Sequence, residues 1–267
     1  MIDTSLTVGI PFHSKTLVSD LKEAIESIIS QTLKADIIHL VQNGDISEEV
    51  DELLKSFMAE HQNIEHLLVE KSGLAAALNV SLRHTRTTYY ARMDSDDISV
   101  RDRLFTQISF LREHPEIDIV GAWAWEFGSQ EGLSKKRLKK MPTDPQKMQE
   151  WVHYRNPFIH PTVMYRVEFI RKLGYYNEVF LTDQDLELWG RAINNGAKIA
   201  NIPTPLLYFR TDNMLSKRSK VDAVMRQIRA RYVVRTWSPR LNILKVLALI
   251  FRLTPRIIRE AGYKYLR

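Results

Sequence analysis

The sequence contains no cysteine among its 267 residues. Disulfide scaffolds, thiolate metal sites and cysteine nucleophiles are thereby excluded, and a reducing compartment is favoured. The first seven residues lack the basic segment and apolar run of a secretory signal, so we expect a cytoplasmic protein. Glycine and proline number only ten each, which excludes collagen-like and low-complexity chains. With 44% hydrophobic and 26% charged residues, the composition predicts a folded globular protein.

Two sequence features associated with common functions are also missing. Neither the Walker pattern nor G-x-G-x-x-G occurs, so no backbone loop of that kind cradles phosphates. The longest apolar stretch near the C-terminus, residues 243–251, contains Lys245 and falls short of the roughly 20 apolar residues that a spanning helix needs. We therefore expect no transmembrane helix of this segment.

Positive charge is concentrated at the C-terminal end. The chain carries a net charge of +6, yet residues 217–267 hold fourteen Lys and Arg against two acidic residues, and residues 1–216 are net acidic. On a helical wheel, four basic residues of this tail share one narrow sector away from Leu244, Leu247, Phe251 and Ile258: Lys245, Arg252, Arg256 and Arg259. Such a basic amphipathic helix is typical of binding to an anionic membrane surface. The alternative is a helix that packs its apolar face on the body and keeps its basic face in water.

The body alternates short β-branched runs with longer amphipathic ones. We predict strands at 6–12, 37–41, 64–69, 87–93, 117–125, 162–165, 198–202 and 206–209. We predict helices at 18–31, 47–60, 73–84, 145–154 and 182–195. This alternation indicates an α/β fold with a mostly parallel central sheet, in which ligands bind at the carboxyl ends of the strands. We interpret residues 1–216 as one domain and 217–267 as a basic amphipathic helical tail.

Three aspartates directly follow the strand predicted at 87–93. Asp94, Asp96 and Asp97 lie within four residues and repel one another unless a cation lies between them. Carboxylates suit Mg²⁺ or Mn²⁺, which bridge to substrate phosphates. The alternative is a helix N-cap before Ile98. Because one residue is enough to cap a helix, the cluster favours a metal-bound phosphate ester, such as a nucleotide.

Five segments, taken in order, resemble glycosyltransferase family 2. They are 7–13 (TVGIPFH), 73–79 (GLAAALN), 91–97 (ARMDSDD), 156–164 (NPFIHPTVM) and 184–191 (QDLELWGR). The resemblance covers roughly residues 5–216 and implies a nucleotide-sugar-binding domain of the glycosyltransferase A type. It also implies transfer with inversion at the anomeric carbon.

The resemblance assigns roles to residues on the donor side. It implies that Asp96 binds the Mn²⁺ or Mg²⁺ ion, with Asp94 on the nucleotide and as a second possible metal ligand. Asp212 stands near the place of a metal-binding histidine of many relatives. Asn43 replaces the family's usual aspartate at the uracil ring, and its amide oxygen can still accept from the ring N–H. The other residues assigned to the nucleotide-sugar are Pro11, His13, Asn79, Arg92 and Ser95.

Inverting transfer needs a base for the acceptor hydroxyl. Gln184-Asp185 resembles the family's Glu-Asp pair, so we predict Asp185 as the base and Asp183 as the runner-up, although Asp183 also suits a helix cap. Glu187 is expected to face water. His160, Trp189 and Arg210 are predicted at the acceptor side of the pocket. A structural role for His160 is an equal alternative.

These features predict an enzyme that moves glucose or galactose from a UDP-sugar to a polyprenyl-diphosphate-linked saccharide in surface polysaccharide or O-antigen assembly, at the inner face of the cell membrane. One alternative is a sugar nucleotidyltransferase, which normally needs a glycine-rich loop that residues 9–13 lack. Another is a non-catalytic protein that binds nucleic acid or membrane through its tail. The acidic body argues against nucleic acid as a partner.

Overall fold

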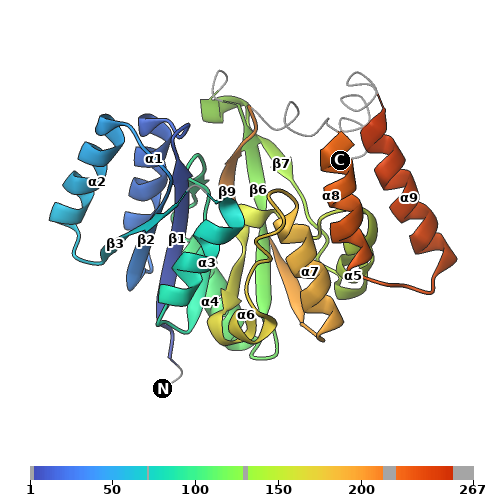
Figure 1. Cartoon of the computed structure of the whole chain (residues 1–267). Coiled ribbons are helices and arrows are strands. Elements are labelled where there is room, and N and C mark those ends of the chain that lie inside the picture. Colours follow the sequence, from blue (N-terminus) through green and yellow to red (C-terminus); the bar gives the residue numbers. More distant parts are fainter. Residues whose placement is uncertain (1–2, 71, 129–131, 213–220, 255–267) are drawn as a thin grey trace.

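The computed structural model describes residues 3–70, 72–128, 132–212 and 221–254 (Figure 1). The strands are β1 Leu6–His13, β2 Ile37–Asn43, β3 Ile64–Val69, β4 Tyr89–Arg92, β5 Ile98–Ser99, β6 Ile119–Phe127, β7 Arg137–Lys139, β8 Met164–Arg166 and β9 Ile199–Arg210. The helices are α1 Val18–Ile29, α2 Glu48–Glu60, α3 Leu74–His84, α4 Arg103–Glu113, α5 Pro145–Tyr154, α6 Val167–Leu173, α7 Gln184–Asn194, α8 Val221–Tyr232 and α9 Pro239–Leu253.

One mixed sheet runs through the molecule. Within the described ranges its order is β3-β2-β1-β4-β8-β6-β9-β5, and β7 pairs with β6. The long pairings of β1 with β2, β2 with β3 and β6 with β9 are parallel, as is that of β1 with β4. The short β8 is antiparallel to both β4 and β6 and joins the two halves. The predicted α/β fold with a mostly parallel central sheet is confirmed.

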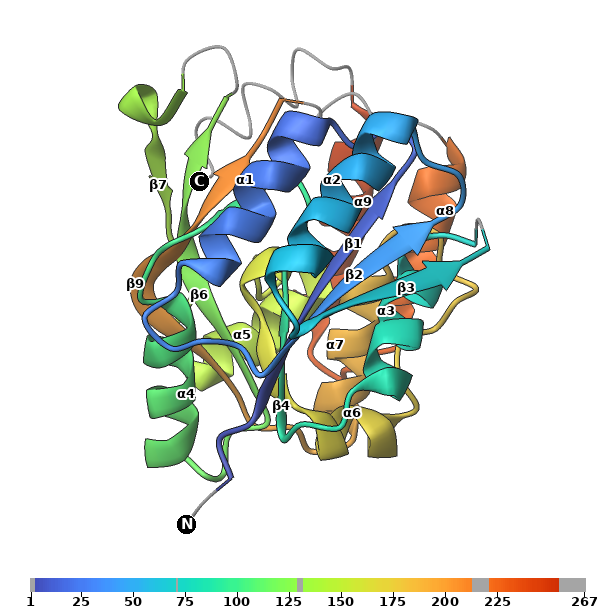
Figure 2. The same ribbon diagram turned by 90° about the vertical axis from the view of Figure 1, so that its left-hand side faces the viewer.

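Two hydrophobic cores lie on opposite faces of this sheet. One core joins α1, α2 and α4 to alternate residues of the sheet, and Figure 2 shows α1 and α2 in front of it. The other core joins α3, α5, α6 and α7 to the opposite face. Neighbouring residues of β4 divide between the two cores, because successive strand side chains point to opposite faces: Tyr89 belongs to the first and Tyr90 to the second. Strand β1 is buried along most of its length, as expected for a central parallel strand.

A close approach between β1 and β4 requires glycine at position 9. A Cβ atom on Gly9 would lie 1.7 Å from the Tyr90 hydroxyl and 2.9 Å from Ser81 Oγ. These two side chains are buried, and the Tyr90 hydroxyl donates to Ser81 Oγ at 2.9 Å. Neither group can move without breaking this contact or the surrounding packing.

We expect Gly9→Ala to lower the free energy of unfolding by about 3 kcal/mol, because the added methyl group overpacks the core. Urea denaturation followed by circular dichroism measures the change. The matched control is Gly128→Ala, where the nearest atom to a new Cβ is Asp212 Oδ1 at 3.4 Å, an ordinary contact. Equal midpoints for the two variants would contradict the expectation.

The structure differs from the predicted elements at several places. The strands predicted at 198–202 and 206–209 form one strand, β9, which passes through Pro203 and Pro205 with irregular pairing to β6. Helices α4 and α6 were not predicted. Ile98 begins strand β5, so the aspartates before it do not cap a helix. That observation removes the capping alternative for the aspartate cluster.

Two helices of the C-terminal segment pack against the body. Helix α8 contacts α7, and α9 contacts α5 and α8. Lys245, predicted on a solvent-facing basic side, is instead 1% exposed; its Nζ donates to the Val234 carbonyl at 2.8 Å and lies 4.7 Å from the Tyr232 ring centroid. The basic sector predicted for this helix is therefore wrong at Lys245, because the lysine finds a carbonyl and a ring within the fold.

Other parts of the tail prediction fall beyond the described residues. The boundary between residues 216 and 217 lies outside them, as do Arg256, Ile258 and Arg259. Among the described residues, no helix combines the length and the apolar character that a bilayer crossing requires.

Candidate active site

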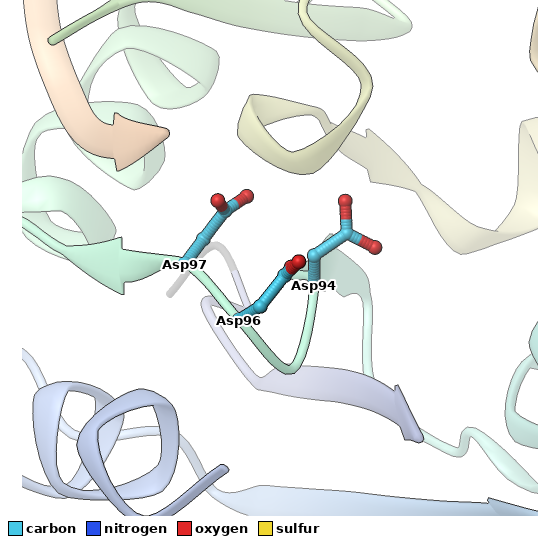
Figure 3. Close-up of side chains that lie close together, drawn as sticks. All are labelled: Asp94, Asp96 and Asp97. Carbon is cyan, nitrogen blue, oxygen red and sulfur yellow. The ribbon is translucent and has the colours of Figure 1, made fainter. Parts of the chain in front are cut away.

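The three aspartates lie on a short loop between β4 and β5 (Figure 3). Each offers one carboxylate oxygen, and these three oxygens all lie within 4.8 Å of one another. The main chain fixes the start of the loop, because the Met93 N–H donates to the Gly9 carbonyl at 3.1 Å. Since β4 is parallel to β1, the loop lies at the carboxyl edge of the sheet, as predicted.

Asp97 is the most deeply placed of the three. It is fully buried, and its Oδ1 accepts from the Arg210 main-chain N–H at 2.9 Å. Its Oδ2 has no hydrogen-bond partner among the described residues. Burial and the carboxylates of Asp94 and Asp96 raise the pKa of Asp97 well above its usual range. A buried carboxylate oxygen without a partner, beside two further carboxylates, fits a divalent cation.

Asp96 opens to solvent at the edge of the cluster. Desolvation by the surrounding chain, and then the Asp94 carboxylate, raise the pKa of Asp96 to about 6. Arg210 closes one side of the loop: its Nε donates to the Asp96 carbonyl at 2.8 Å, and its Nη2 pairs with Glu23 at 3.0 Å. The predicted acceptor-side residue Arg210 thus contacts the aspartate loop directly.

Arg92 lies beneath the cluster with its side chain 2% exposed. Its Nη2 pairs with Asp94 Oδ1, while Nε and Nη1 have no partner among the described residues. Its positive charge lowers the pKa values of Asp96, Asp97 and Asp185 against the larger effect of their burial. Arg92 therefore connects the aspartate loop electrostatically with the predicted base.

Asp185 lies in the first turn of α7. Burial, followed by the charge of Asp183, raises the pKa of Asp185, whereas the Leu186 N–H and the amide of Asn156 lower it. Asn156 Nδ2 donates to Asp185 Oδ2. This bond orients the carboxylate, and the raised pKa suits a group that must accept a proton.

Asp183, the second candidate base, has a different setting. Its backbone is left-handed with φ 61°, at the N-terminus of α7. Its Oδ1 accepts from Gln227 Nε2 on α8 at 2.7 Å, and the preceding Thr182 accepts from Arg226 Nε at 3.0 Å. Asp183 thus binds the tail helix to the start of α7. Glu187, expected in water, is 4% exposed and pairs with Arg191 at 2.9 Å, which corrects that expectation.

His160 and Trp189 pack together. Their ring centroids lie 5.9 Å apart, and His160 Nε2 lies 2.8 Å from the Tyr176 hydroxyl. Desolvation, and then the charge of Arg92, hold the pKa of His160 well below its usual range, so the ring is neutral at pH 7. Trp189 is 1% exposed and also contacts Phe158, which places it in the core rather than at a pocket wall.

The remaining donor-side residues lie near the carboxyl ends of β1 and β2, on the aspartate loop or on α3. Pro11 is buried and paired with Val41, and the exposed His13 ends β1 in register with Asn43. Asn43 Oδ1 accepts from the Ser72 N–H at 3.1 Å. Ser95 Oγ lies 3.4 Å from the hydroxyl oxygen of Thr16, which links the aspartate loop to the turn after β1.

Two predicted residues stand apart from this group. Asn79 is buried, and its amide bonds the main chain of Tyr176 and the carboxylate of Glu178. These contacts give Asn79 a structural role in this conformation. Asp212 follows β9 and is exposed, and it does not belong to the cluster that could hold a metal.

The sequence model of the family described as Glycosyl transferase family 2 matches residues 7–174. A relative named amylovoran biosynthesis glycosyltransferase AmsE, from Erwinia amylovora, is 34% identical over 217 residues, which cover 79% of each chain. The chain belongs to glycosyltransferase family 2.

This family 2 glycosyltransferase also resembles an Escherichia coli protein named UDP-Gal:alpha-D-GlcNAc-diphosphoundecaprenol beta-1,3-galactosyltransferase. The two are 29% identical over 254 residues, covering 91% of this chain and 90% of the other. Among solved structures, Staphylococcus aureus TarS 1–349 in complex with UDP-GlcNAc superposes with a TM-score of 0.70 at 14% identity, covering 93% of this chain and 72% of the other. That likeness confirms the glycosyltransferase A type of fold.

Three residues at or next to the site have places that the sequence alone does not reveal. Asp97 was grouped with the aspartates, but its burial beneath the loop was not foreseen. Asn156 is the first residue of the segment 156–164 that resembles the family, but only the fold brings it to Asp185. Gln227 lies in the C-terminal segment, 44 positions from Asp183 in sequence, and no sequence motif connects the two residues. Only the fold brings them together.

Proposed function

We propose that this glycosyltransferase moves a hexose, glucose or galactose, from a UDP-sugar to a polyprenyl-diphosphate-linked saccharide during bacterial surface polysaccharide or O-antigen assembly. The reaction inverts the anomeric carbon, depends on Mn²⁺ or Mg²⁺, and takes place in the cytoplasm at the inner face of the cell membrane. The observation that carries the proposal is the aspartate loop and Asp185, linked by the charge of Arg92, in a family 2 fold.

The donor half of the proposal rests on the carboxyl edge of β1, β2 and β4. His13 and Asn43 would meet the nucleoside there, and the Asn43 amide suits a uracil ring. Asp96, with Asp94 and Asp97 beside it, would hold the metal ion, and the buried Arg92 would set the positive charge beneath them. The TarS structures that share the fold are described with UDP-GlcNAc and with UDP, which supports a UDP-sugar as donor.

The chemical step follows from the two sides of the site. Asp185 removes the proton from the acceptor hydroxyl as the oxygen attacks the anomeric carbon, and the bond from that carbon to the diphosphate breaks. Asn156 holds the carboxylate in place for this transfer. A bound divalent cation supplies Lewis-acid stabilisation of the leaving diphosphate. Inversion results because the acceptor and the leaving group occupy opposite faces of the sugar.

The acceptor half of the proposal rests on relatives. The E. coli protein is named for transfer to GlcNAc-diphosphoundecaprenol, and the E. amylovora protein for biosynthesis of amylovoran. Both match most of their own length to this chain, which supports a similar class of acceptor here. Membership of glycosyltransferase family 2 argues against the alternative of a sugar nucleotidyltransferase.

The metal ion should stabilise the protein in a manner that depends on pH. At a free concentration about 100 times the dissociation constant, bound Mn²⁺ adds about 2.7 kcal/mol to the free energy of unfolding. The cation binds ionised carboxylates, and the pKa of Asp96 is about 6. We therefore expect Mn²⁺ to raise the melting temperature more at pH 7.5 than at pH 5, where a proton competes for the site.

Without a metal ion, the free energy of unfolding should depend on pH in the opposite direction. In the folded protein the pKa of Asp96 lies above the ordinary value of 3.8, so the folded state binds the extra proton and stability falls as pH rises from about 4 to about 6. Differential scanning fluorimetry with and without Mn²⁺ measures both effects. Asp96→Asn is the control and should remove most of the Mn²⁺ shift at pH 7.5. An equal Mn²⁺ shift at both pH values in both proteins would contradict the assignment.

The proposed reaction is tested by release of UDP from a panel of UDP-sugars with Mn²⁺ or Mg²⁺, with and without a short polyprenyl-diphosphate-linked GlcNAc acceptor. We expect one UDP-hexose to give metal-dependent release that the acceptor stimulates. No turnover of any UDP-sugar, together with turnover of a GDP- or dTDP-sugar, would overturn the nucleotide assignment at Asn43.

A further inference from the structure

Helix α9 presents an apolar stripe to solvent. Its four members follow the spacing i, i+3, i+4, i+7 of one helix face, and each is between 45% and 59% exposed: Ile243, Val246, Leu247 and Ile250. Trp237 stands in the turn just before the helix and is fully exposed. We call these five residues the α9 stripe. Large apolar side chains gathered on one exposed helix face, with an exposed tryptophan at the start of the helix, indicate an interaction site.

The opposite face of α9 is already occupied by the protein. Lys245 and Leu249 are buried there, and α9 packs on α5 and α8. Arg240 forms an ion pair with Glu150 of α5 at 3.8 Å. Figure 1 shows α9 as the outermost helix on its edge of the molecule, beyond α8. Helix α9 is thus already packed on the domain through one face, and the α9 stripe is its other, exposed face.

We propose that the α9 stripe inserts into the surface of an anionic bilayer. The charge around it favours this occupant: Arg229, Arg235 and Arg240 are exposed on α8, on the connecting turn and on α9, and the segment 217–267 carries fourteen Lys and Arg against two acidic residues. Cationic side chains beside a buried apolar face bind anionic headgroups while the apolar face enters the acyl boundary. Tryptophan prefers that boundary because its ring is apolar and its N–H is polar.

A second copy of this chain is the less suitable occupant. A two-fold contact through the α9 stripe would bring two strongly basic segments together, and their repulsion opposes the contact. An anionic bilayer supplies the charge that the segment lacks. The lipid contact differs from the one that the sequence suggested, because Lys245 faces the protein and the apolar side faces outward.

The inference rests on the proposed function only for the reason to bind a bilayer, which is that a lipid-linked acceptor lies there. The test measures bilayer binding separately from sugar transfer. Flotation or cosedimentation with vesicles of phosphatidylcholine, alone and mixed with phosphatidylglycerol, measures binding without any substrate. We expect binding to the mixed vesicles, weaker binding to phosphatidylcholine alone, and partial loss with added salt as the headgroup attraction is screened.

The decisive variant is Ile243→Glu combined with Leu247→Glu. It should weaken binding to the mixed vesicles about tenfold or more, because two apolar anchors become charged. The matched control is Leu68→Glu on β3, which is 69% exposed but lies outside the stripe, and it should bind as the wild type does. Circular dichroism checks that both variants are folded.

Activity supplies the second readout. With a short-chain, detergent-free acceptor analogue, the stripe variant should release UDP at the wild-type rate, whereas its activity on acceptor embedded in mixed vesicles should fall. Unchanged vesicle binding by the stripe variant would overturn the inference. So would a wild-type dimer, seen by light scattering, that the stripe variant converts to a monomer. Loss of activity in the wild type on every acceptor would instead concern the proposed reaction and leave the vesicle result intact.

Discussion

Asp185→Asn should lower the rate of sugar transfer by a factor of about 10² to 10⁴, the usual contribution of a general base. The substitution keeps the shape of the side chain, and the single amide oxygen of the new asparagine can still accept from Asn156 Nδ2. It removes only the negative charge that takes the proton. The expected result is a lower kcat with little change in the KM for the UDP-sugar, measured by release of UDP in the presence of acceptor.

Asp183→Asn is the matched control, the same change two residues earlier. Asparagine tolerates the left-handed backbone of this position, and its carbonyl oxygen can still accept from Gln227. We therefore expect most of the activity to remain. The reverse outcome, with Asp183→Asn inactive and Asp185→Asn active, would exchange the roles of the two aspartates.

Arg92→Met should have the largest effect on stability. The arginine side chain is 2% exposed and pairs with Asp94, and its charge opposes the repulsion among Asp94, Asp96 and Asp97. Removing the cation leaves the Asp94 carboxylate, which is 29% exposed, and the buried Asp97 carboxylate without compensation, and breaking a buried pair costs about 3–5 kcal/mol. Chemical denaturation at pH 7.5 without metal measures the loss, and transfer activity should fall with it.

Arg83→Met provides the comparison at an exposed ion pair. Arg83 pairs with Glu178 at 3.2 Å, and both side chains are about half exposed. Its loss should cost less than about 1 kcal/mol. Arg92→Lys should fall between the two variants, because the charge stays while the donors decrease. Similar losses for Arg92→Met and Arg83→Met would show that burial of the first pair has no energetic weight.

The first half of the fold was predictable because its strands and helices have clear periods. The helix predicted at 73–84 and the strand at 64–69 agree with α3 and β3 to within a residue, and the helix predicted at 47–60 agrees equally well with α2, which Ser47 caps. Helix α4 escaped prediction because its buried face includes Arg103 and Gln107, which bind main-chain and side-chain groups of the core. A polar residue on an inward face breaks the apolar pattern on which the prediction depends.

The site was predictable where residues adjoin in sequence and not where the fold joins distant ones. The three aspartates and Asp185 stand in short segments that resemble the family. By contrast, the Arg210 N–H reaches Asp97 across 113 positions. The orientation of α9 was missed for a related reason, since a helical wheel separates its faces but does not say which one the body covers. A single carbonyl, that of Val234, decided the place of Lys245.

The order of β9 and α8 along the chain limits how enzymes of this kind can be recombined. Arg210 at the end of β9 contacts the aspartate loop, and Arg226 and Gln227 on the next helix contact the residues just before Asp185. One continuous piece of chain therefore contacts both the aspartate loop and the start of α7. A chimaera that takes α7 from another enzyme should therefore take the segment equivalent to residues 199–232 from the same enzyme. Otherwise the contacts between α8 and the start of α7 are lost.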